Sequence, residues 1–274
     1  MDKNGTLTLL QWAGDRQKEV ALATGHSGRA RQVLISYTWD APARKGVLSV
    51  EIGDTGAHVF CTLEAPLPLS LRDAVRLMAD PRSTRYCSGT VFAAMADHVV
   101  PIGPMPSLLP STPVATPRGY KEVGQLQRGD TVLTGNAGIV PVLHSLGRMV
   151  PARGSYRPVR LRAPYFGLQQ DIIVSPEQRL LIDGPEVEYL FGQEAVLVPA
   201  RHLVNGFTAI PEPSGPTVRY TQVLLPKHET ILAAGTELES LYVGRIRRHA
   251  VDLGNSLLRE MDRSGLPEHG RPSH

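Results

Sequence analysis

The sequence is poor in cysteine, in aromatic residues and in net charge, and each shortage argues against a class of protein. Its 274 residues include two cysteines, and aromatic side chains make up 5%. Cys61 and Cys87 lie far apart and form no C-x-x-C pair, so neither a zinc knuckle nor a redox dithiol is indicated. The formal net charge of +3 comes without a basic run that would form one face, so no nucleic-acid partner is expected.

Long apolar runs are also missing. No stretch approaches the roughly 18 apolar residues of a spanning helix, so we expect no membrane span. Residues 1–14 have no cationic segment leading into an apolar core, and no signal peptide is visible. The default expectation is a cytoplasmic protein in which Cys61 and Cys87 are buried thiols. Non-classical export is the alternative, and these two cysteines would pair only in that case.

Glycine and proline are frequent, with 26 and 23 copies, and this favours many short strands joined by turns. Short segments bounded by Gly, Asp and Pro predict strands at Thr6–Trp12, Glu19–Thr24, Gln32–Trp39, Gly46–Ile52 and His58–Leu63. A helix over Leu69–Ala79 is expected to close this small sandwich with one apolar stripe. Residues 1–98 are therefore predicted to be a β-rich domain. They carry no catalytic motif, and their role stays open.

Proline becomes dense after Val99, which predicts an extended linker over residues 99–113. Regular turn chemistry resumes beyond it, as in Gly135–Gly138 between two short strand segments. The composition changes again at Arg245, and residues 245–274 are expected to be a partly disordered tail. The predicted fold class is all-β, with a small β-rich N-terminal domain followed by a second β domain over residues 107–244.

Four blocks of the second domain, in register, closely resemble bacterial Hint domains, the fold shared by inteins and hedgehog autoprocessing domains. The blocks are Val114–Thr134, Ile173–Ile182, Val196–Gly206 and Tyr220–Ser240. Each is weakly specific alone, but together they cover about half of the chain. The resemblance implies an all-β Hint fold and, as function, self-processing by cleavage of the chain's own peptide bond.

In this family the first residue of the domain is a Cys or Ser that attacks the carbonyl of the preceding residue and converts the peptide bond to an ester or thioester. The register places this position at Ser107, after Pro106. A hydroxyl is a weak nucleophile unless a neighbouring group removes its proton. The alternative interpretation is a solvated linker serine.

The second element resembles the family's Thr-x-x-His block, whose histidine protonates the departing nitrogen. Here the block begins at Ser175 and ends at Gln178. A glutamine amide donates hydrogen bonds but delivers no proton at neutral pH. Loss of a positioned general acid typically costs on the order of 10²–10⁴ in rate.

The third element contains His228, the matching histidine that the resemblance retains. Two interpretations are open: it polarises a carbonyl, or it is a half-buried histidine bonded to backbone. Gln222 stands where the family's Tyr-x-His segment has histidine, and the terminal His-Asn pair that inteins need is missing. The sequence therefore predicts no splicing.

Two functional hypotheses remain. One is a self-processing module with slow or lost N–O acyl-shift chemistry at Pro106–Ser107, using Ser107, Ser175, Gln178 and His228. The other is a non-enzymatic β scaffold or binding module that recognises a protein or a glycan. No cofactor is implied, and the histidines show no metal-like spacing, so no metal is expected.

Overall fold

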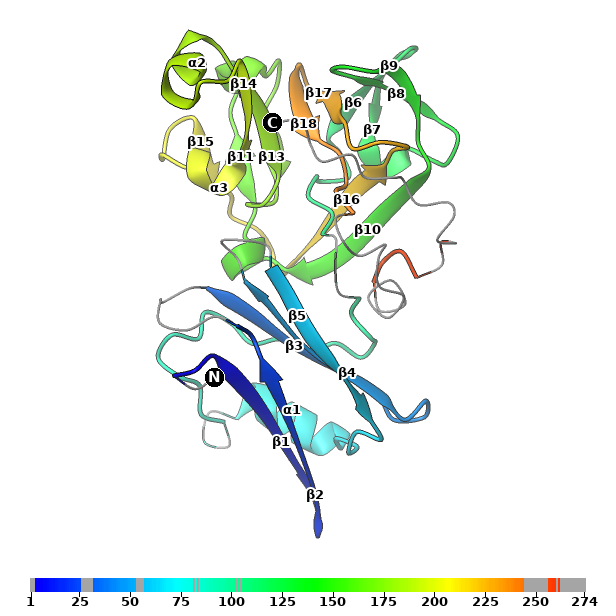
Figure 1. Cartoon of the computed structure of the whole chain (residues 1–274), viewed down its shortest axis with the longest axis vertical. Helices are drawn as coiled ribbons and strands as arrows, with labels where there is room; N and C mark the ends of the chain where they lie inside the picture. The colour runs from blue at the N-terminus through cyan, green and yellow to red at the C-terminus, as the bar shows by residue number, and fades with distance from the viewer. Residues whose placement is uncertain are drawn as a thin grey trace. The chain divides into compact units, whose positions relative to one another are not determined.

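The chain divides into two compact units, Met1–Ile102 and Gly103–His274. The computed structural model describes residues 3–25, 32–52, 57–80, 82, 84–101, 103, 105–243, 256–259 and 261. Both units are built mainly from strands (Figure 1), which confirms the all-β prediction. In this described part, no helix is long and apolar enough to cross a membrane.

The first unit contains a hairpin and a three-stranded antiparallel sheet. Strands β1 (Thr6–Ala13) and β2 (Arg16–Ala23) form the hairpin. The sheet has the order β3-β4-β5, with bounds Val33–Asp40, Lys45–Ile52 and Ala57–Glu64. The five strands begin and end within a few residues of the predicted segments. Alternating apolar side chains from the two sheets form one core: Leu7, Leu22, Leu48, Val50, Ile52 and Leu63.

Helix α1 (Leu71–Ala79) follows these strands and differs from its expected role. It begins after Ser70, whose hydroxyl accepts a hydrogen bond from the backbone N–H of Asp73 at 3.1 Å and so caps the helix. No residue of α1 is buried, and the side chain of Leu71 is 80% exposed. The expectation that this helix closes the sandwich through an apolar stripe is therefore wrong. Its periodicity indicated a helix correctly but said nothing about what the stripe packs against.

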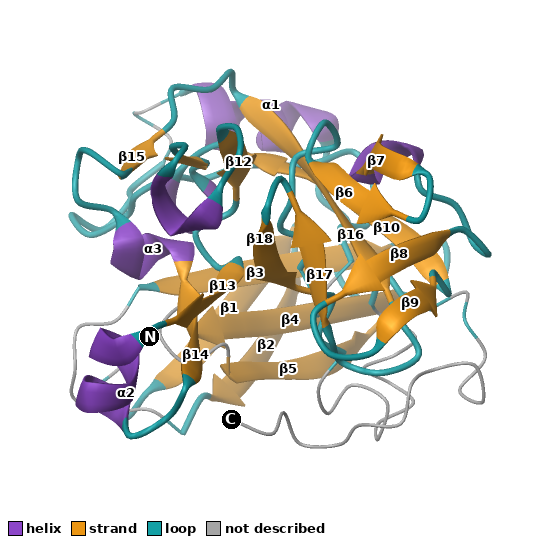
Figure 2. Ribbon diagram, turned by 90° about the horizontal axis from the view of Figure 1, so that it is seen from above, coloured by secondary structure: helices purple, strands orange, loops and turns teal. Residues whose placement is uncertain are grey.

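The second unit is dominated by one large sheet, seen from above in Figure 2, with the path β14-β13-β18-β17-β6-β7 and with β8 pairing both β17 and β9. The bounds are β6 (Pro113–Thr116), β7 (Gly119–Glu122), β8 (Thr131–Thr134), β9 (Gly138–Pro141), β13 (Arg179–Asp183), β14 (Ala195–Pro199), β17 (Thr230–Ala233) and β18 (Thr236–Glu239). The β17–β18 turn contains Gly235 at φ 95°, where an added Cβ would lie 2.7 Å from the Gly167 oxygen. Only glycine fits that turn without strain.

Two smaller groups of strands complete this unit. The long pair β10 (His144–Pro151) and β16 (Thr217–Leu224) runs antiparallel. A short sheet has the order β12-β11-β15, with bounds Ile172–Val174, Val159–Leu161 and Ala209–Pro211. The helical segments are short: α2 (Pro185–Phe191), α3 (Ala200–Leu203) and the single turns η1 (Val123–Gln125), η2 (Gly154–Tyr156) and η3 (Tyr165–Gly167).

The core of the second unit collects side chains from most of these strands. Its fully buried members include Leu108, Val174, Leu180, Ile231 and Leu238. A satellite cluster packs Leu258 against Leu146, Leu224, Leu241 and Val243, so part of the segment predicted as a tail contributes to the fold. Apart from residues 256–259 and 261, the predicted tail lies outside the described residues.

The chain joins this fold at Ser107, earlier than the predicted end of the linker at residue 113. Leu108 forms bridges with both Val174 and Thr221 and is completely buried. Its N–H donates to the Thr221 oxygen at 3.1 Å, and the Thr221 N–H donates back to the Leu108 oxygen at 2.7 Å. We therefore propose that the linker ends before Ser107, because these ladder bonds belong to the second unit.

Limited trypsin digestion tests whether the second unit is an independent core. We expect the first cut after Arg85, which is exposed and lies outside any strand or helix, and we expect a stable fragment that begins at Tyr86. Lys121 in β7 and Arg148 in β10 serve as internal controls, because strand ladders protect them. Mass spectrometry of a time course identifies the sites. Equally fast cutting after Lys121 would show that the second unit is not an independent core.

Candidate functional site

Ser107 is held from both sides as the chain enters the second unit. Its carbonyl accepts a hydrogen bond from the Ser175 N–H at 2.7 Å, and its neighbour Leu108 is paired with β16 through Thr221. Ser107 is 7% exposed. It is a buried residue of the fold, and the interpretation as a solvated linker serine is therefore wrong.

Two glutamines surround the hydroxyl of Ser107. The hydroxyl donates to Oε1 of Gln178 at 2.5 Å and accepts from Nε2 of Gln222 at 3.1 Å. The Gln222 amide also donates to Oε1 of Gln178 at 3.1 Å. Gln178 and Gln222 are 2% and 1% exposed, so this polar cluster is closed off from water.

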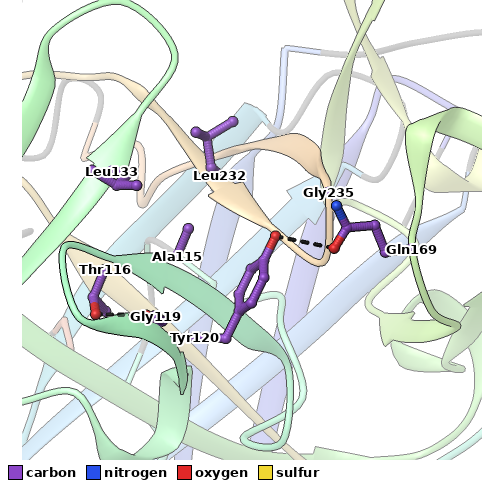
Figure 3. Close-up of a pocket in the computed structure, with 8 residues that line it drawn as sticks. All are labelled: Ala115, Thr116, Gly119, Tyr120, Leu133, Gln169, Leu232 and Gly235. Carbon is purple, nitrogen blue, oxygen red and sulfur yellow. Dashed lines mark hydrogen bonds between the residues drawn. The ribbon is translucent and has the colours of Figure 1, made fainter.

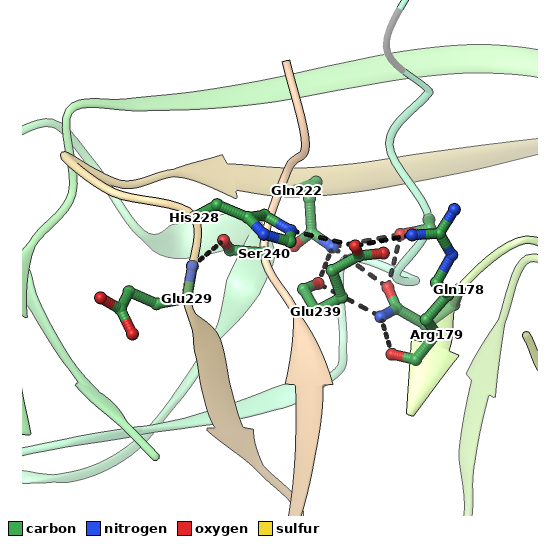
Figure 4. Close-up of polar contacts among 8 residues, drawn as sticks. Gln178, Arg179, Gln222, His228, Glu229, Glu239 and Ser240 are labelled. Carbon is green, nitrogen blue, oxygen red and sulfur yellow. Dashed lines mark hydrogen bonds and ion pairs between the residues drawn. The ribbon is translucent and has the colours of Figure 1, made fainter. Parts of the chain in front are cut away.

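The main-chain carbonyl of Glu239 fixes how both amides are turned. It accepts from Nε2 of Gln178 at 3.2 Å and from Nε2 of Gln222 at 3.0 Å (Figure 4). Because a carbonyl only accepts, both amide nitrogens must face it. A further bond from Nε2 of Gln178 to the Arg179 oxygen, at 2.7 Å, imposes the same orientation. The Gln178 oxygen is therefore the atom presented to Ser107.

Local structure places both amides. Ser175 follows β12, and the turn after it brings Gln178 back, with the Gln178 N–H donating to the Ser175 oxygen at 3.1 Å. The Ser175 hydroxyl accepts from the Glu177 N–H at 3.3 Å and so stabilises this turn. Gln222 lies within β16, directly opposite Leu146 of β10. The structure thus brings Ser107, Ser175 and Gln178 together from segments distant in the sequence.

His228 reaches the cluster only through Glu239. Its Nε2 lies 3.0 Å from Oε1 of Glu239, and the same oxygen lies 3.0 Å from Nη1 of Arg179. This contact is an ion-pair distance, and Nε2 is buried without a hydrogen-bond partner in the described part. The ring of His228 packs edge-on against Tyr242 at 4.9 Å between centroids. The contact of the His228 imidazole is thus a carboxylate, and its role at the site stays a proposal.

The electrostatics of the cluster follow from these contacts. In the described part of the chain, the hydrogen bonds of the Ser107 hydroxyl go to neutral amides, and an amide oxygen is too weak a base to remove a hydroxyl proton at neutral pH. The carbonyl of Glu239 is linked to Ser107 through the amides of Gln178 and Gln222. The arrangement orients the hydroxyl through hydrogen bonds to these two amides.

Arg148 is a residue of this region that sequence reasoning missed. It lies in β10 directly opposite Tyr220, is 9% exposed, and its Nε has no hydrogen-bond partner among the residues that the structure describes. Burial raises the pKa of the Tyr220 phenol, and its hydroxyl donates to the Tyr156 oxygen at 2.8 Å. Tyr220 is therefore neutral and does not balance the charge of Arg148.

A separate hollow of about 410 Å³ opens on the large sheet (Figure 3). It is mainly apolar, and the Tyr120 hydroxyl donates to Oε1 of Gln169 at 3.4 Å at its margin. Its lining comes from Ala115, Thr116, Gly119, Tyr120, Leu133, Gln169, Leu232 and Gly235. It shares no residue with the Ser107 cluster.

Substitutions in the cluster should differ in their effect on stability. Gln178→Ala removes an amide with partners at Ser107, Gln222, Arg179 and Glu239, and should cost about 2–4 kcal/mol by leaving several buried groups unpaired. Ser107→Ala removes two hydrogen bonds, to Gln178 and Gln222, and should cost about 1 kcal/mol. Urea unfolding followed by circular dichroism measures both. Equal costs would mean that the amides do not act as a connected network.

Comparisons with known proteins agree with this architecture. Residues 106–245 match the family model of the Hint domain, which is just over half of the chain. Among solved structures, the chain is similar to the bacterial intein-like domain from Clostridium thermocellum, with 13% identity and a TM-score of 0.38, covering 50% of this chain and 99% of that one. It is also similar to the gp41-1 intein, with 16% identity and a TM-score of 0.32, covering 49% and 97%.

A third similar structure is the MchDnaB-1 intein, with 16% identity and a TM-score of 0.34, covering 48% of this chain and 98% of that one. None of the curated protein sequences matches the chain. The match to the family model spans the large sheet, the β10–β16 pair and the glutamine cluster around Ser107. The chain therefore belongs to the Hint-domain family.

Proposed function

We propose that residues 106–245 are a Hint module that keeps the fold of self-processing domains and has slow or lost cleavage chemistry at Pro106–Ser107. The main observation behind this proposal is that the Ser107 hydroxyl is hydrogen-bonded to two amide groups, Oε1 of Gln178 and Nε2 of Gln222. Ser107, Ser175, Gln178 and His228 are the residues that we assign to the proposed site.

The reaction itself makes clear what the cluster lacks. The oxygen of Ser107 would attack the carbonyl carbon of Pro106, and its proton would pass to a base. The resulting tetrahedral oxyanion would collapse by breaking the C–N bond, while the nitrogen gains a proton and an ester forms. Both proton transfers need a titratable group, and the two glutamines supply none.

Pro106 adds a further obstacle. Its ring crowds the attacked carbonyl and restricts Met105 to extended geometry, which limits how the scissile unit can adjust. Ser107 is also fixed through its own carbonyl by the Ser175 N–H. A chain held in this way is protected against the rearrangement that an acyl shift requires.

The second candidate function is a non-enzymatic scaffold that presents the first unit to a protein or a glycan. It is favoured by Trp12 on β1, whose side chain is 64% exposed. Exposed aromatic side chains are typical of binding surfaces. In this alternative the only role of Gln178 and Gln222 is structural: they hold Ser107 where the chain joins the second unit.

The substitution Gln178→His tests the first proposal. We expect no detectable cleavage of the wild-type protein by hydroxylamine, and slow cleavage at Pro106–Ser107 in Gln178→His, because an imidazole can carry the missing proton. The gain should be on the order of 10²-fold or more over the wild type. Intact-mass spectrometry over hours of incubation detects the fragment that begins at Ser107.

Two controls accompany this experiment. Gln127→His adds an exposed histidine away from the cluster and should give no cleavage. Ser107→Ala combined with Gln178→His should abolish cleavage. Rapid cleavage of the wild type contradicts the proposed loss of chemistry, and cleavage that survives Ser107→Ala shows that the nucleophile is another residue.

A further inference from the structure

Arg148 is a buried cation without a matching anion. The side chains of Arg160, Arg179 and Arg201 each pair with a glutamate. Within the described ranges, Arg148 has no such ion pair, and its Nε is buried without a hydrogen-bond partner. Its contact through Nη1 is to the sulfur of Met105 at 3.7 Å. A charge buried in this way costs folding free energy, so its position calls for a physical reason.

The strand register places Arg148 on the face that carries the Ser107 cluster. Residues directly opposite each other in an antiparallel pair point to the same face, and so do residues two positions along a strand. Arg148 is opposite Tyr220, and Gln222 follows two residues later opposite Leu146. Arg148 and Gln222 are therefore diagonal neighbours on one face of the β10–β16 pair.

These two side chains contact the chain on either side of Pro106. Arg148 contacts Met105, and Gln222 contacts Ser107. The carbonyl of Pro106, which is the carbonyl that Ser107 would attack, lies in the chain between these two contacts. A buried positive charge, without a counter-ion in the described part of the chain, thus contacts the residue that precedes Pro106.

We propose that Arg148 stabilises the oxyanion that forms on Pro106 when the Ser107 oxygen attacks. This inference rests on the proposed function, since it assigns a role in the same acyl shift. The attack converts the neutral carbonyl into a tetrahedral centre with a full negative charge on oxygen, while the serine proton leaves for a base. A fixed cation in a dry site stabilises that charge far more than it stabilises the neutral carbonyl.

This role explains why the cation remains unpaired. An aspartate or glutamate beside Arg148 would lower the cost of burial and would also cancel the field at the Pro106 oxygen. In this proposal Arg148 still supplies the charge that stabilises the oxyanion, while Gln178 and Gln222 stand where the family has histidines that transfer protons. Arg148 would therefore reveal its effect only when a proton carrier is restored.

The test uses the full chain with Gln178→His and adds Arg148→Met, Arg148→Lys or Arg219→Met. Arg219 is the matched control, because it lies on the opposite, exposed face of β16, across from Met149. We expect Arg148→Met to reduce hydroxylamine-dependent cleavage on the order of 10²-fold and Arg148→Lys to retain part of the rate. Arg219→Met should leave the rate unchanged.

Thermal unfolding of the same variants gives a readout independent of cleavage. Since a buried, unpaired guanidinium destabilises the fold, Arg148→Met should raise Tm while it lowers the cleavage rate. A lower Tm for Arg148→Met would mean that Arg148 has a structural partner, and an unchanged cleavage rate would mean that it does not act on the oxyanion. Either result overturns the inference.

The failure of the proposed function is distinguishable from the failure of this inference. If the wild type cleaves rapidly, the loss of chemistry is refuted, and Arg148→Met is then assayed in the wild-type background. If Gln178→His gives no cleavage, the missing proton carrier is refuted as the cause. The change in Tm for Arg148→Met then decides whether the cation is unpaired, with a fall in Tm overturning the inference.

Discussion

The main-chain carbonyl of Glu239 is the acceptor on which the arrangement of the site depends. Because this carbonyl accepts from the amide nitrogens of both Gln178 and Gln222, the Gln178 oxygen is turned toward Ser107. The Ser107 hydroxyl then donates its proton in a hydrogen bond to that oxygen. The carboxylate of the same residue lies between Arg179 and His228, which holds this part of β18 in place. Glu239 thus connects the charged side chain of Arg179 and the imidazole of His228 to the two uncharged amides of Gln178 and Gln222.

A centre built from amides differs in kind from one built from imidazoles. An amide donates and accepts hydrogen bonds at once and stays uncharged at any physiological pH, so it satisfies buried partners without moving protons. The hydroxyl of Ser107 and the amides of Gln178 and Gln222 pair with one another, and the result is a buried hydrogen-bond network. Arg148 departs from this pattern, since its charge is buried on the same face without a counter-ion among the described residues.

The sequence predicted the fold well where local patterns decide it. Alternation in segments such as Val47–Ile52 gave the strands of the first unit, and four blocks in register gave the Hint domain with Ser107, Ser175 and Gln178 in one place. The packing of α1 was not predictable, because a helical period does not specify what its apolar side chains contact. Proline density set the predicted end of the linker at residue 113 and gave no sign of the bridges of Leu108, on which our proposal of an earlier end rests.

The roles of Glu239, His228 and Arg148 were beyond the sequence for a different reason. Glu239 acts through a backbone carbonyl, which every residue possesses, so its side chain gives no signal. His228 was expected at the reacting centre, but it meets a carboxylate that only the β17–β18 register brings close. An unpaired arginine is recognisable only once its surroundings are known, because in the sequence Arg148 resembles any other strand residue.

The most direct test of the account is the intact mass of the full-length protein after prolonged incubation, with and without hydroxylamine. The account predicts a single unprocessed mass in both samples, because the Ser107 proton has no titratable acceptor. Hydroxylamine is needed because an ester formed by the acyl shift has the same mass as the peptide. Two fragments corresponding to residues 1–106 and 107–274, formed by the wild type, would contradict the account.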